Sequence, residues 1–409
     1  MGENHFSAAF FKANRARLQA LFTGTAPIVL TSNGLLQRST DTAYPFTQDG
    51  NFWYLTGIDE PNVILVIDKG KEYLIVPELS EVRQAFDGQQ DSSALSIISG
   101  VEEVVSEKVG WRRLNARVKR AGSVAVLSPS TSYIEALGMF TNPARKRLIR
   151  ELKRQNGALT FLDLRAHLQR MRMVKQEPEL AAIKQAINVT TIALGKVQKK
   201  YQKGTYKNEF EIELELTNYF FQGGGNGHSF EPIVAAGDKA CTIHPQGNHH
   251  ELLEKQPLLL DVGAVVEHYA ADISRSWCLE PSKRHLAVHG AVVEVADFAK
   301  SLLKPGILLK EYEQNIENFM GEKLRALGLI KNIDHESVRR YFPHATSHFL
   351  GIDVHDVGDY SLSLEKGVVL TVEPGIYIPE EGIGIRIEDD ILITEKGHEN
   401  LSVDLSDDL

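Results

Sequence analysis

Four acidic residues inside apolar, strand-like segments constrain this chain more than any other feature of its sequence. Two of them lie in PLLLDVGAVVEHYAADISRSW (257–277) and two in GVVLTVEPGIYIPEEGIGIRIEDDILIT (367–394). They are Asp261, Asp272, Glu373 and Glu388. An ionised carboxylate in apolar surroundings is unfavourable unless it is paired, protonated or bound to a cation. The fold must therefore bring these side chains to partners.

The first segment is expected to form an antiparallel hairpin. If Val266 and Glu267 make its turn, residues whose numbers sum to 533 oppose one another, and Asp261 and Asp272 satisfy that sum. Their Cβ atoms would then lie about 4.5–5.5 Å apart on one face. Two carboxylates at this separation repel each other unless one is protonated or a cation lies between them.

The second segment repeats this arrangement. Pro379, Glu380, Glu381 and Gly382 are typical turn residues. A turn centred there pairs positions that sum to 761, and Glu373 and Glu388 meet that condition. Period-two alternation gives the second strand an apolar isoleucine face and a face that carries Gly384, Arg386 and Glu388.

Three of the 14 histidines lie in HATSHFLGIDVHDVG (344–358), at His344, His348 and His355. Taken alone, this segment favours satisfied core histidines beside a polar turn. A second pair of facing acids changes that interpretation, because acids on a wet strand face would not be expected at mirror positions in two apolar hairpins. Four carboxylates and the imidazole of His348 favour a site for two divalent ions, with Mn²⁺ a natural occupant. Such ions, about 3.5–4 Å apart, can deprotonate a bridging water for attack on a carbonyl.

Length, charge and cysteine usage narrow the class of protein. The chain of 409 residues is too long for one ordinary core, and we predict two domains at 1–165 and 166–409. A net charge of -9 argues against a nucleic-acid partner. Cys241 and Cys278 lie far apart without CxxC spacing, which favours a reducing compartment over disulfides or a thiolate metal site.

Membrane and secretory signals are not evident in the sequence. No apolar run approaches the roughly 20 residues that a membrane-spanning helix needs. The segment MGENHFSAAFFKANRARLQALF lacks the basic and apolar regions of a secretory signal. We therefore predict a cytoplasmic protein with no membrane partner.

Strand and helix patterns alternate in the first domain, which predicts an α/β layer structure. An amphipathic first helix would place Phe10, Phe11, Leu18 and Leu21 on one face. The further expected elements are strands at 27–34, 63–68, 72–77 and 123–129 and a helix at 141–157 capped by Asn142.

Long helices are expected in the second domain, at 176–198 and 283–306. FEIELEL (210–216) alternates as a strand would, but its helix-forming residues and its place after a long helix favour a helix.

These motifs together resemble a known family. LLLDVGA, ADISRSW, SHFLGIDVHDVG, TVEPGIYI and GIGIRIEDDI are similar to segments of the pita-bread metallopeptidases, specifically the Xaa-Pro aminopeptidases (aminopeptidase P). QDGNFWYLTGIDEP (48–61) resembles that family's first domain, and RMVKQEPEL (172–180) resembles its domain junction. The resemblance implies an α/β (α+β) protein in which an N-terminal α/β creatinase-like domain precedes a C-terminal pita-bread catalytic domain.

The resemblance also implies roles for the metal-binding residues. Asp261 would bind one ion, Asp272 and Glu388 would bridge two, and His348 with Glu373 would complete the other. The ions would be two divalent metals, Mn²⁺ by preference, with Co²⁺ or Zn²⁺ as alternatives. Glu373 would also act as the general base that accepts the proton of a metal-bridged hydroxide.

Four further residues are implied at the substrate site. His244 and His355 would be catalytic and would contact the substrate, while His344 and Arg386 would bind it. Alternatives remain from the residues alone, because His244 could cap a loop and Arg386 could pair with Asp390. His249 and His250 match no motif and are interpreted as solvated loop residues.

The implied activity is hydrolysis of the Xaa-Pro bond at the N-terminus of peptides. That amide has no N–H, so a shape-selective pocket for the proline ring and metal polarisation of the carbonyl would replace a strand-like grip. The alternative enzyme is a prolidase, which shares all five ligands. Less favoured are a methionine aminopeptidase, a metal-free creatinase and a non-catalytic pita-bread binding module. We also predict a homo-oligomer, either a dimer or a tetramer.

Overall fold

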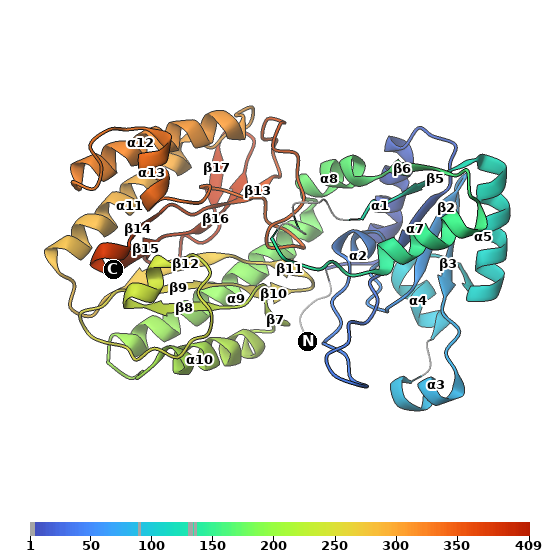
Figure 1. Cartoon of the computed structure of the whole chain (residues 1–409), viewed down its shortest axis with the longest axis horizontal. Helices are drawn as coiled ribbons and strands as arrows, with labels where there is room; N and C mark the ends of the chain where they lie inside the picture. Colours follow the sequence, from blue (N-terminus) through green and yellow to red (C-terminus); the bar gives the residue numbers. More distant parts are fainter. Residues whose placement is uncertain (1–4, 89–90, 130–133, 135–136) are drawn as a thin grey trace. The chain divides into compact units, whose positions relative to one another are not determined.

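Residues 5–88, 91–129, 134 and 137–409 are described by the computed structural model and divide into two units (Figure 1). One unit spans Phe6–Met171, and the other spans Arg172–Leu409 together with His5. The predicted domain boundary, between residues 165 and 166, falls at the start of α8 (Arg165–Met173). None of the helices in the described ranges is both long and apolar enough to cross a membrane.

The first unit contains a six-stranded mixed sheet in the order β4-β3-β2-β1-β5-β6. The β2–β3 hairpin confirms the prediction, and Lys69 and Gly70 both adopt positive φ angles (52° and 76°), as a tight hairpin turn requires. The strands are β1 (Ile28–Thr31), β2 (Ile64–Asp68), β3 (Lys71–Val76), β4 (Glu103–Ser106), β5 (Ser123–Val126) and β6 (Thr160–Asp163).

Helices cover this sheet by burying apolar stripes. Leu114 and Val118 of α5 (Glu107–Ala121) and Leu148 and Leu152 of α7 (Ala144–Gln155) join the sheet's core. The N-cap of α7 is Pro143, one residue after the predicted Asn142, and the Asn142 side chain accepts the Ala144 N–H at 3.1 Å. The remaining helices are α1 (Ala8–Leu21), α2 (Gly50–Thr56), α3 (Glu81–Asp87) and α4 (Ser92–Ser99).

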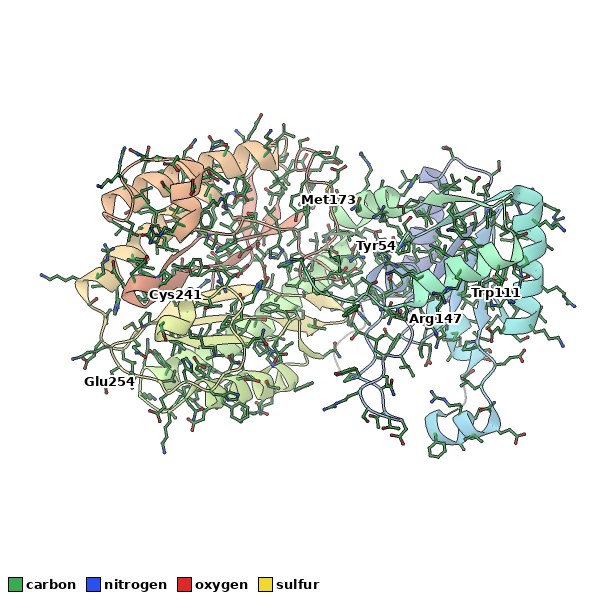
Figure 2. All side chains as sticks on the ribbon, viewed as in Figure 1. Tyr54, Trp111, Arg147, Met173, Cys241 and Glu254 are labelled. Atoms are coloured by element: carbon green, nitrogen blue, oxygen red, sulfur yellow. The ribbon has the colours of Figure 1, made fainter. Side chains whose placement is uncertain are left out.

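The first helix departs from the prediction at its C-terminal end. Phe10, Phe11 and Leu18 of α1 are buried, but Leu21 is 41% exposed. The helix ends at Leu21, so this residue lies beyond the aromatic cluster that Phe10 and Phe11 form with Trp53 of α2. Figure 2 shows the side chains of this unit and of the second unit on their ribbons.

The second unit places short sheets between two groups of helices (Figure 1). Its sheets have the orders β11-β10-β7, β12-β9-β8, β13-β16-β17 and β14-β15. The strands are β7 (Gly227–His228), β8 (Ile233–Ala236), β9 (Leu258–Val262), β10 (Ala264–Val266), β11 (Tyr269–Ala270), β12 (Ile273–Trp277), β13 (Val369–Val372), β14 (Gly375–Ile378), β15 (Ile383–Arg386), β16 (Asp389–Ile393) and β17 (His398–Asn400).

Both predicted long helices are confirmed, and FEIELEL lies within a helix. Gln176 and Glu179 form a reciprocal cap at the start of α9, and Asn208 caps α10, so side chains satisfy the free backbone N–H groups. The helices are α9 (Glu177–Tyr201), α10 (Glu209–Gln222), α11 (Lys283–Leu302), α12 (Leu309–Ala326) and α13 (His335–Tyr341), with short 3₁₀ helices η1 (Gly237–Cys241) and η2 (Pro379–Glu381).

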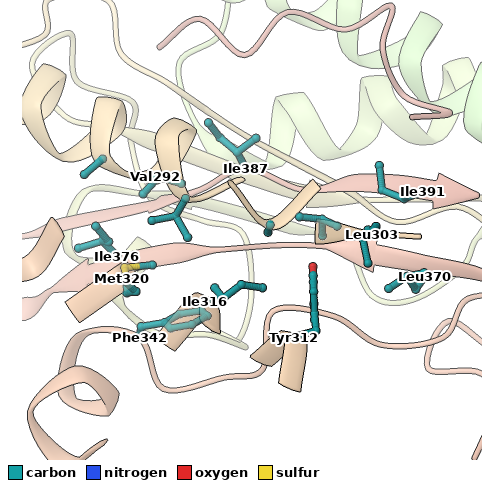
Figure 3. Packing of buried hydrophobic residues seen from close by; sticks show 14 of the residues in the cluster. Val292, Leu303, Tyr312, Ile316, Met320, Phe342, Leu370, Ile376, Ile387 and Ile391 are labelled. Carbon is teal, nitrogen blue, oxygen red and sulfur yellow. The ribbon is translucent and has the colours of Figure 1, made fainter. Parts of the chain in front are cut away.

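A large apolar cluster of this unit lies between α11, α12 and strands β13–β16 (Figure 3). Ile383, Ile385 and Ile387 belong to this cluster, which confirms the predicted apolar face of the second hairpin. Because side chains alternate along a strand, the opposite face of the same hairpin carries Arg386 and Glu388 away from the core. The apolar core thus determines which way the acidic face points.

The first acidic hairpin has a different register from the predicted one. Asp261 pairs with Ser274, so opposing residues sum to 535. The turn residues are Glu267 and His268, with φ angles of 46° and 72°, rather than Val266 and Glu267. The residue opposite Asp261 is therefore two positions further along than predicted. Because the shift is an even number of residues, Asp272 stays on the same face of the hairpin as Asp261 and lies diagonally across from it.

The second acidic hairpin has the predicted register. Gly375 pairs with Arg386 and Val372 pairs with Asp389, and both pairs sum to 761. The turn is η2 followed by Gly382, whose φ of 64° suits a residue without a side chain. Glu373 and Glu388 occupy the short break between the two strand pairs.

A close backbone approach at Gly263 yields a stability prediction. A Cβ atom there would lie 1.7 Å from the Ala271 carbonyl oxygen, whereas a Cβ at Gly290 in α11 has open space around it. We expect Gly263→Ala to reduce the free energy of unfolding by about 3 kcal/mol or more. Gly290→Ala should increase it by about 0.5–1 kcal/mol. Thermal unfolding of both variants tests this, and equal shifts in Tm would contradict the packing described for Gly263.

Candidate metal centre

The four acidic residues and His348 line one cavity in the second unit, with a volume of about 540 Å³. Asp261 comes from β9, and Asp272 directly precedes β12. Glu373 and Glu388 come from the break between β13–β16 and β14–β15, and His348 comes from the loop between α13 and β13. The fold therefore brings the five predicted ligands to one place, although Asp261 and Glu388 are more than 120 residues apart in the sequence.

Hydrogen bonds join the two acidic hairpins. The Glu388 N–H donates to the Ser274 carbonyl at 3.1 Å, and the Ser274 hydroxyl donates to Glu388 Oε2 at 2.7 Å. Because Ser274 pairs directly with Asp261, these bonds tie the two hairpins together at the acidic residues.

The Nε2 nitrogen of His348 faces the acids. Its Nδ1 lies 3.1 Å from the Phe349 carbonyl, which can only accept, so Nδ1 carries the proton in a neutral ring. Nε2 then presents a lone pair, and it lies 3.4 Å from Asp272 Oδ2 and 3.6 Å from Glu373 Oε1. A lone pair that faces carboxylate oxygens is repulsive unless a cation or a proton lies between them.

The pKa values of the acids also favour a bound cation. Burial, followed by repulsion from neighbouring carboxylates, raises the pKa values of Asp272, Glu373 and Glu388 well above their usual range. Ligand atoms of Asp272, His348 and Glu388 lie within 4.8 Å of one another.

Two acid oxygens lack hydrogen-bond donors. Oδ1 of Asp261 and Oδ1 of Asp272 are buried without a donor among the described residues. Carboxylate oxygens with an imidazole nitrogen form a donor set that suits Mn²⁺, Co²⁺ or Zn²⁺. The residues present therefore fit bound divalent cations.

Arg386 is the fixed positive charge of this site. It is 2% exposed, and it donates to Asp261 Oδ2 at 2.5 Å, to the Tyr377 hydroxyl at 2.7 Å and to the Ser274 hydroxyl at 2.8 Å. The alternative in which it pairs with Asp390 is wrong, because Asp390 Oδ2 accepts the Asp272 N–H at 3.1 Å and its Oδ1 has no hydrogen-bond partner among the described residues. Arg386 lines the cavity, and its contacts offset part of the acidic charge.

His344 lies beside Glu373, whose Oε2 is 3.6 Å from its Nδ1, and it takes part in a chain of hydrogen bonds. Its Nδ1 donates to the Ala345 carbonyl at 2.9 Å, so its Nε2 accepts from the Tyr377 hydroxyl at 2.8 Å. Burial and the positive charge of Arg386 lower the pKa of His344 to about 3. His344 is therefore neutral near pH 7.

His355 and His244 line the cavity from two loops. The His355 ring lies 4.2 Å from the ring of His348 between centroids. Partial burial and the neighbouring imidazole of His348 lower the pKa of His355 to about 4, so this ring is also neutral near pH 7. His244 follows η1, whose last residue, Cys241, is labelled in Figure 2.

Some lining residues were missed by the sequence analysis. His249, interpreted there as a solvated residue, is exposed but lines the cavity beside Phe210 of α10, with 6.3 Å between ring centroids. Neither residue belongs to a motif, so the sequence carries no local signal for them. Tyr377, which hydrogen-bonds to Arg386 and His344, was also missed. The sequence could have indicated it, because strand alternation places it on the same face as Gly375 and Glu373.

Comparison with known proteins agrees with this architecture. Residues 181–395 match the model of metallopeptidase family M24, and residues 11–126 match that of the aminopeptidase P N-terminal domain. An Xaa-Pro aminopeptidase of Escherichia coli is 31% identical over 96% of this chain and 94% of its own length. E. coli aminopeptidase P with the inhibitor Pro-Leu has a TM-score of 0.84 at 28% identity, over 98% of this chain and 96% of that one. The same values hold for a zinc-substituted form of that enzyme in complex with product.

The chain belongs to metallopeptidase family M24. Its N-terminal region places it with the members that carry an aminopeptidase P N-terminal domain. The predicted resemblance to the Xaa-Pro aminopeptidases and the predicted two-part fold are both confirmed.

Metal binding should stabilise the protein measurably. A cation that binds only the folded state adds about 2.7 kcal/mol at a free concentration 100 times its Kd. We expect Mn²⁺ to raise the Tm of metal-free protein, and Asp272→Asn and Glu388→Gln to reduce that rise. Glu395→Gln, which alters an exposed acid paired with Lys366, serves as the control. An undiminished rise in both site variants would place the cation elsewhere.

Proposed function

We propose that this protein is a metal-dependent Xaa-Pro aminopeptidase, which releases the first residue from peptides with proline in second position. The observation that carries the proposal is the convergence of four carboxylic side chains and the imidazole of His348 in one cavity. The full-length similarity to proteins named Xaa-Pro aminopeptidase supports the substrate class.

The proposed ligands are the five residues predicted from the sequence. The family resemblance implies that Asp272 and Glu388 would contribute to both ions, and their ligand atoms lie within 4.8 Å of each other and of His348. Asp261 would complete one ion, and His348 with Glu373 the other. We take Mn²⁺ as the preferred ion, with Co²⁺ and Zn²⁺ as alternatives. When bound, the ions supply Lewis acidity that polarises the peptide carbonyl and activates a water.

Glu373 is proposed as the general base. Its side chain is 18% exposed, compared with 7% for Asp272, so of these two it is the more accessible to a water in the cavity. The proline nitrogen must gain a proton when its bond to the carbonyl carbon breaks. The proton that Glu373 accepts from the attacking water is available for that transfer.

His355 and His244 are proposed to bind the reacting peptide. A neutral imidazole can donate one N–H to a carbonyl oxygen as negative charge develops there, without carrying a charge of its own into the cavity. His344 is proposed to act on the substrate side as well, in the hydrogen-bonded chain with Tyr377 and Arg386.

The alternatives are less well supported. Several relatives of this chain, including the one from E. coli, are named Xaa-Pro aminopeptidases, which disfavours the prolidase alternative. A non-catalytic module would not need all five ligand residues, and all are present. Cytoplasmic residence and a homo-oligomer, either a dimer or a tetramer, stay predictions that cell fractionation and size-exclusion chromatography with light scattering can test.

Variants at Glu373 and His355 should behave differently. Glu373→Gln removes a charged ligand oxygen and the base, so kcat should fall by about 10²–10⁴-fold and metal affinity should also decrease. His355→Ala removes a donor to the substrate, so kcat should fall by about 10²-fold while metal content stays unchanged. Steady-state kinetics with elemental analysis of each variant tests the pair. Loss of bound metal in His355→Ala would contradict its assignment to the substrate side.

Substrate length separates an aminopeptidase from a dipeptidase. A dipeptidase must bind the free carboxylate of proline, whereas an aminopeptidase leaves that end of the cavity open. We expect a higher kcat/KM for an Xaa-Pro-Yaa tripeptide than for the matched Xaa-Pro dipeptide. Kinetics on one such pair decides the question. A dipeptide preference above about tenfold, roughly 1.4 kcal/mol in transition-state binding, would favour a prolidase.

A further inference from the structure

The segment RMVKQEPEL, at the start of the second unit, supplies two buried cations to a single carboxylate. Arg172 is 1% exposed and Lys175 is 5% exposed, and both bind Asp356. Asp356 directly follows His355 in the sequence. We propose that Arg172 and Lys175 are positioning residues, which hold Asp356 and thereby aim His355 into the catalytic cavity. This inference rests on the substrate-side role proposed for His355.

The contacts divide the carboxylate of Asp356 between the two cations. Arg172 donates to Oδ1 at 2.5 Å, and Lys175 donates to Oδ2 at 2.8 Å. Lys175 also donates to the Arg172 carbonyl at 2.6 Å, and Arg172 also donates to Asp353 at 2.8 Å. Arg172 therefore binds acids on both sides of His355, at positions 353 and 356.

The backbone around Asp356 is built to fit this arrangement. The Asp356 N–H donates to the Phe349 carbonyl at 2.8 Å, which closes the loop that carries His355. A Cβ atom on Gly351 would lie 2.0 Å from Asp356 Oδ2 and 2.9 Å from Lys175 Nζ. The Phe349 carbonyl is also the acceptor for His348 Nδ1. The same turn of backbone thus supports a metal-ligating histidine and the histidine that faces the substrate.

The stability of the fold does not by itself account for this group of buried charges. Buried ion pairs seldom stabilise a fold more than apolar side chains of similar size, although removal of one partner is costly. Burial opposes ionisation of Asp356, but the charges of Arg172 and Lys175 lower its pKa, so it stays ionised. Two directional charged contacts fix the position of a carboxylate more tightly than apolar packing would. His355 is exposed within the cavity, so its aim depends on the anchored residue beside it.

A double-mutant cycle tests this inference. Lys175→Met keeps the chain length but removes one cation, and we expect kcat to fall about 10- to 100-fold with KM nearly unchanged and metal content retained. In the His355→Ala background the same substitution should lower kcat less than about twofold further, because the residue it positions is gone. Lys184→Met, which alters a half-exposed lysine of α9 paired with Glu399, is the matched control and should leave both backgrounds unchanged.

Each other outcome overturns the inference in a recognisable way. Equal losses in both backgrounds would show that Lys175 acts independently of His355, and loss of metal would show that it acts on the ions. If His355→Ala is fully active, the role proposed for His355 fails, and with it this inference. Asp356→Asn provides a second variant, with the same cycle, if Lys175→Met does not fold.

A measurement without substrate separates this inference from the proposed activity. Hydrogen–deuterium exchange over residues 349–358 should accelerate in Lys175→Met and stay unchanged in Lys184→Met. This result does not depend on which peptide is cut, so accelerated exchange in a protein inactive on Xaa-Pro peptides would reject the proposed function alone. Unchanged exchange in an active protein would reject only the positioning role of Arg172 and Lys175.

Discussion

Mutual repulsion among four carboxylates in one cavity is the interaction on which the catalytic unit depends. Arg386 offsets one of the four negative charges that the carboxylates carry when all are ionised, so three would remain in excess around His348, whose Nε2 faces the acids. Apolar strands and a large core force this arrangement, because the isoleucine face of β14–β15 can be buried only when the acidic face points into the cavity. The core thus stabilises a site that is unfavourable by itself and becomes favourable when cations bind.

The two hairpins show how far a sequence determines such a site. For the second hairpin, the PEEG turn and the alternation of isoleucines were sufficient to predict the register. The observed register is the one that opposes Glu373 and Glu388. For the first, the turn falls on Glu267 and His268, both at positive φ, where Asn or Gly is the usual signal. The error moved each partner by two residues, so the face was still right and Asp261 and Asp272 still meet the same cavity.

Contacts between distant segments could not be obtained from spacing. Ser274 links the hairpins through a hydroxyl that an apolar strand pattern does not single out. Tyr377, between Arg386 and His344, was within reach of the alternation rule, whereas His249 and Phe210 depend on how a loop packs on α10. Side-chain chemistry along a strand is therefore readable from sequence, but the walls of the cavity are a property of the tertiary fold.

The resemblance to a family identified RMVKQEPEL but left it without a physical role. The structure supplies one, since Arg172 and Lys175 reach a carboxylate more than 180 residues away, next to a histidine of the cavity. The balance of acidic and basic groups differs between the cavity and the surroundings of Asp356. At the cavity, acids exceed their protein partners and require external cations, whereas at Asp356 two internal cations saturate one acid. The unsaturated cluster can respond to metal and substrate, and the saturated one can act only as a fixed support for the loop that carries His348 and His355.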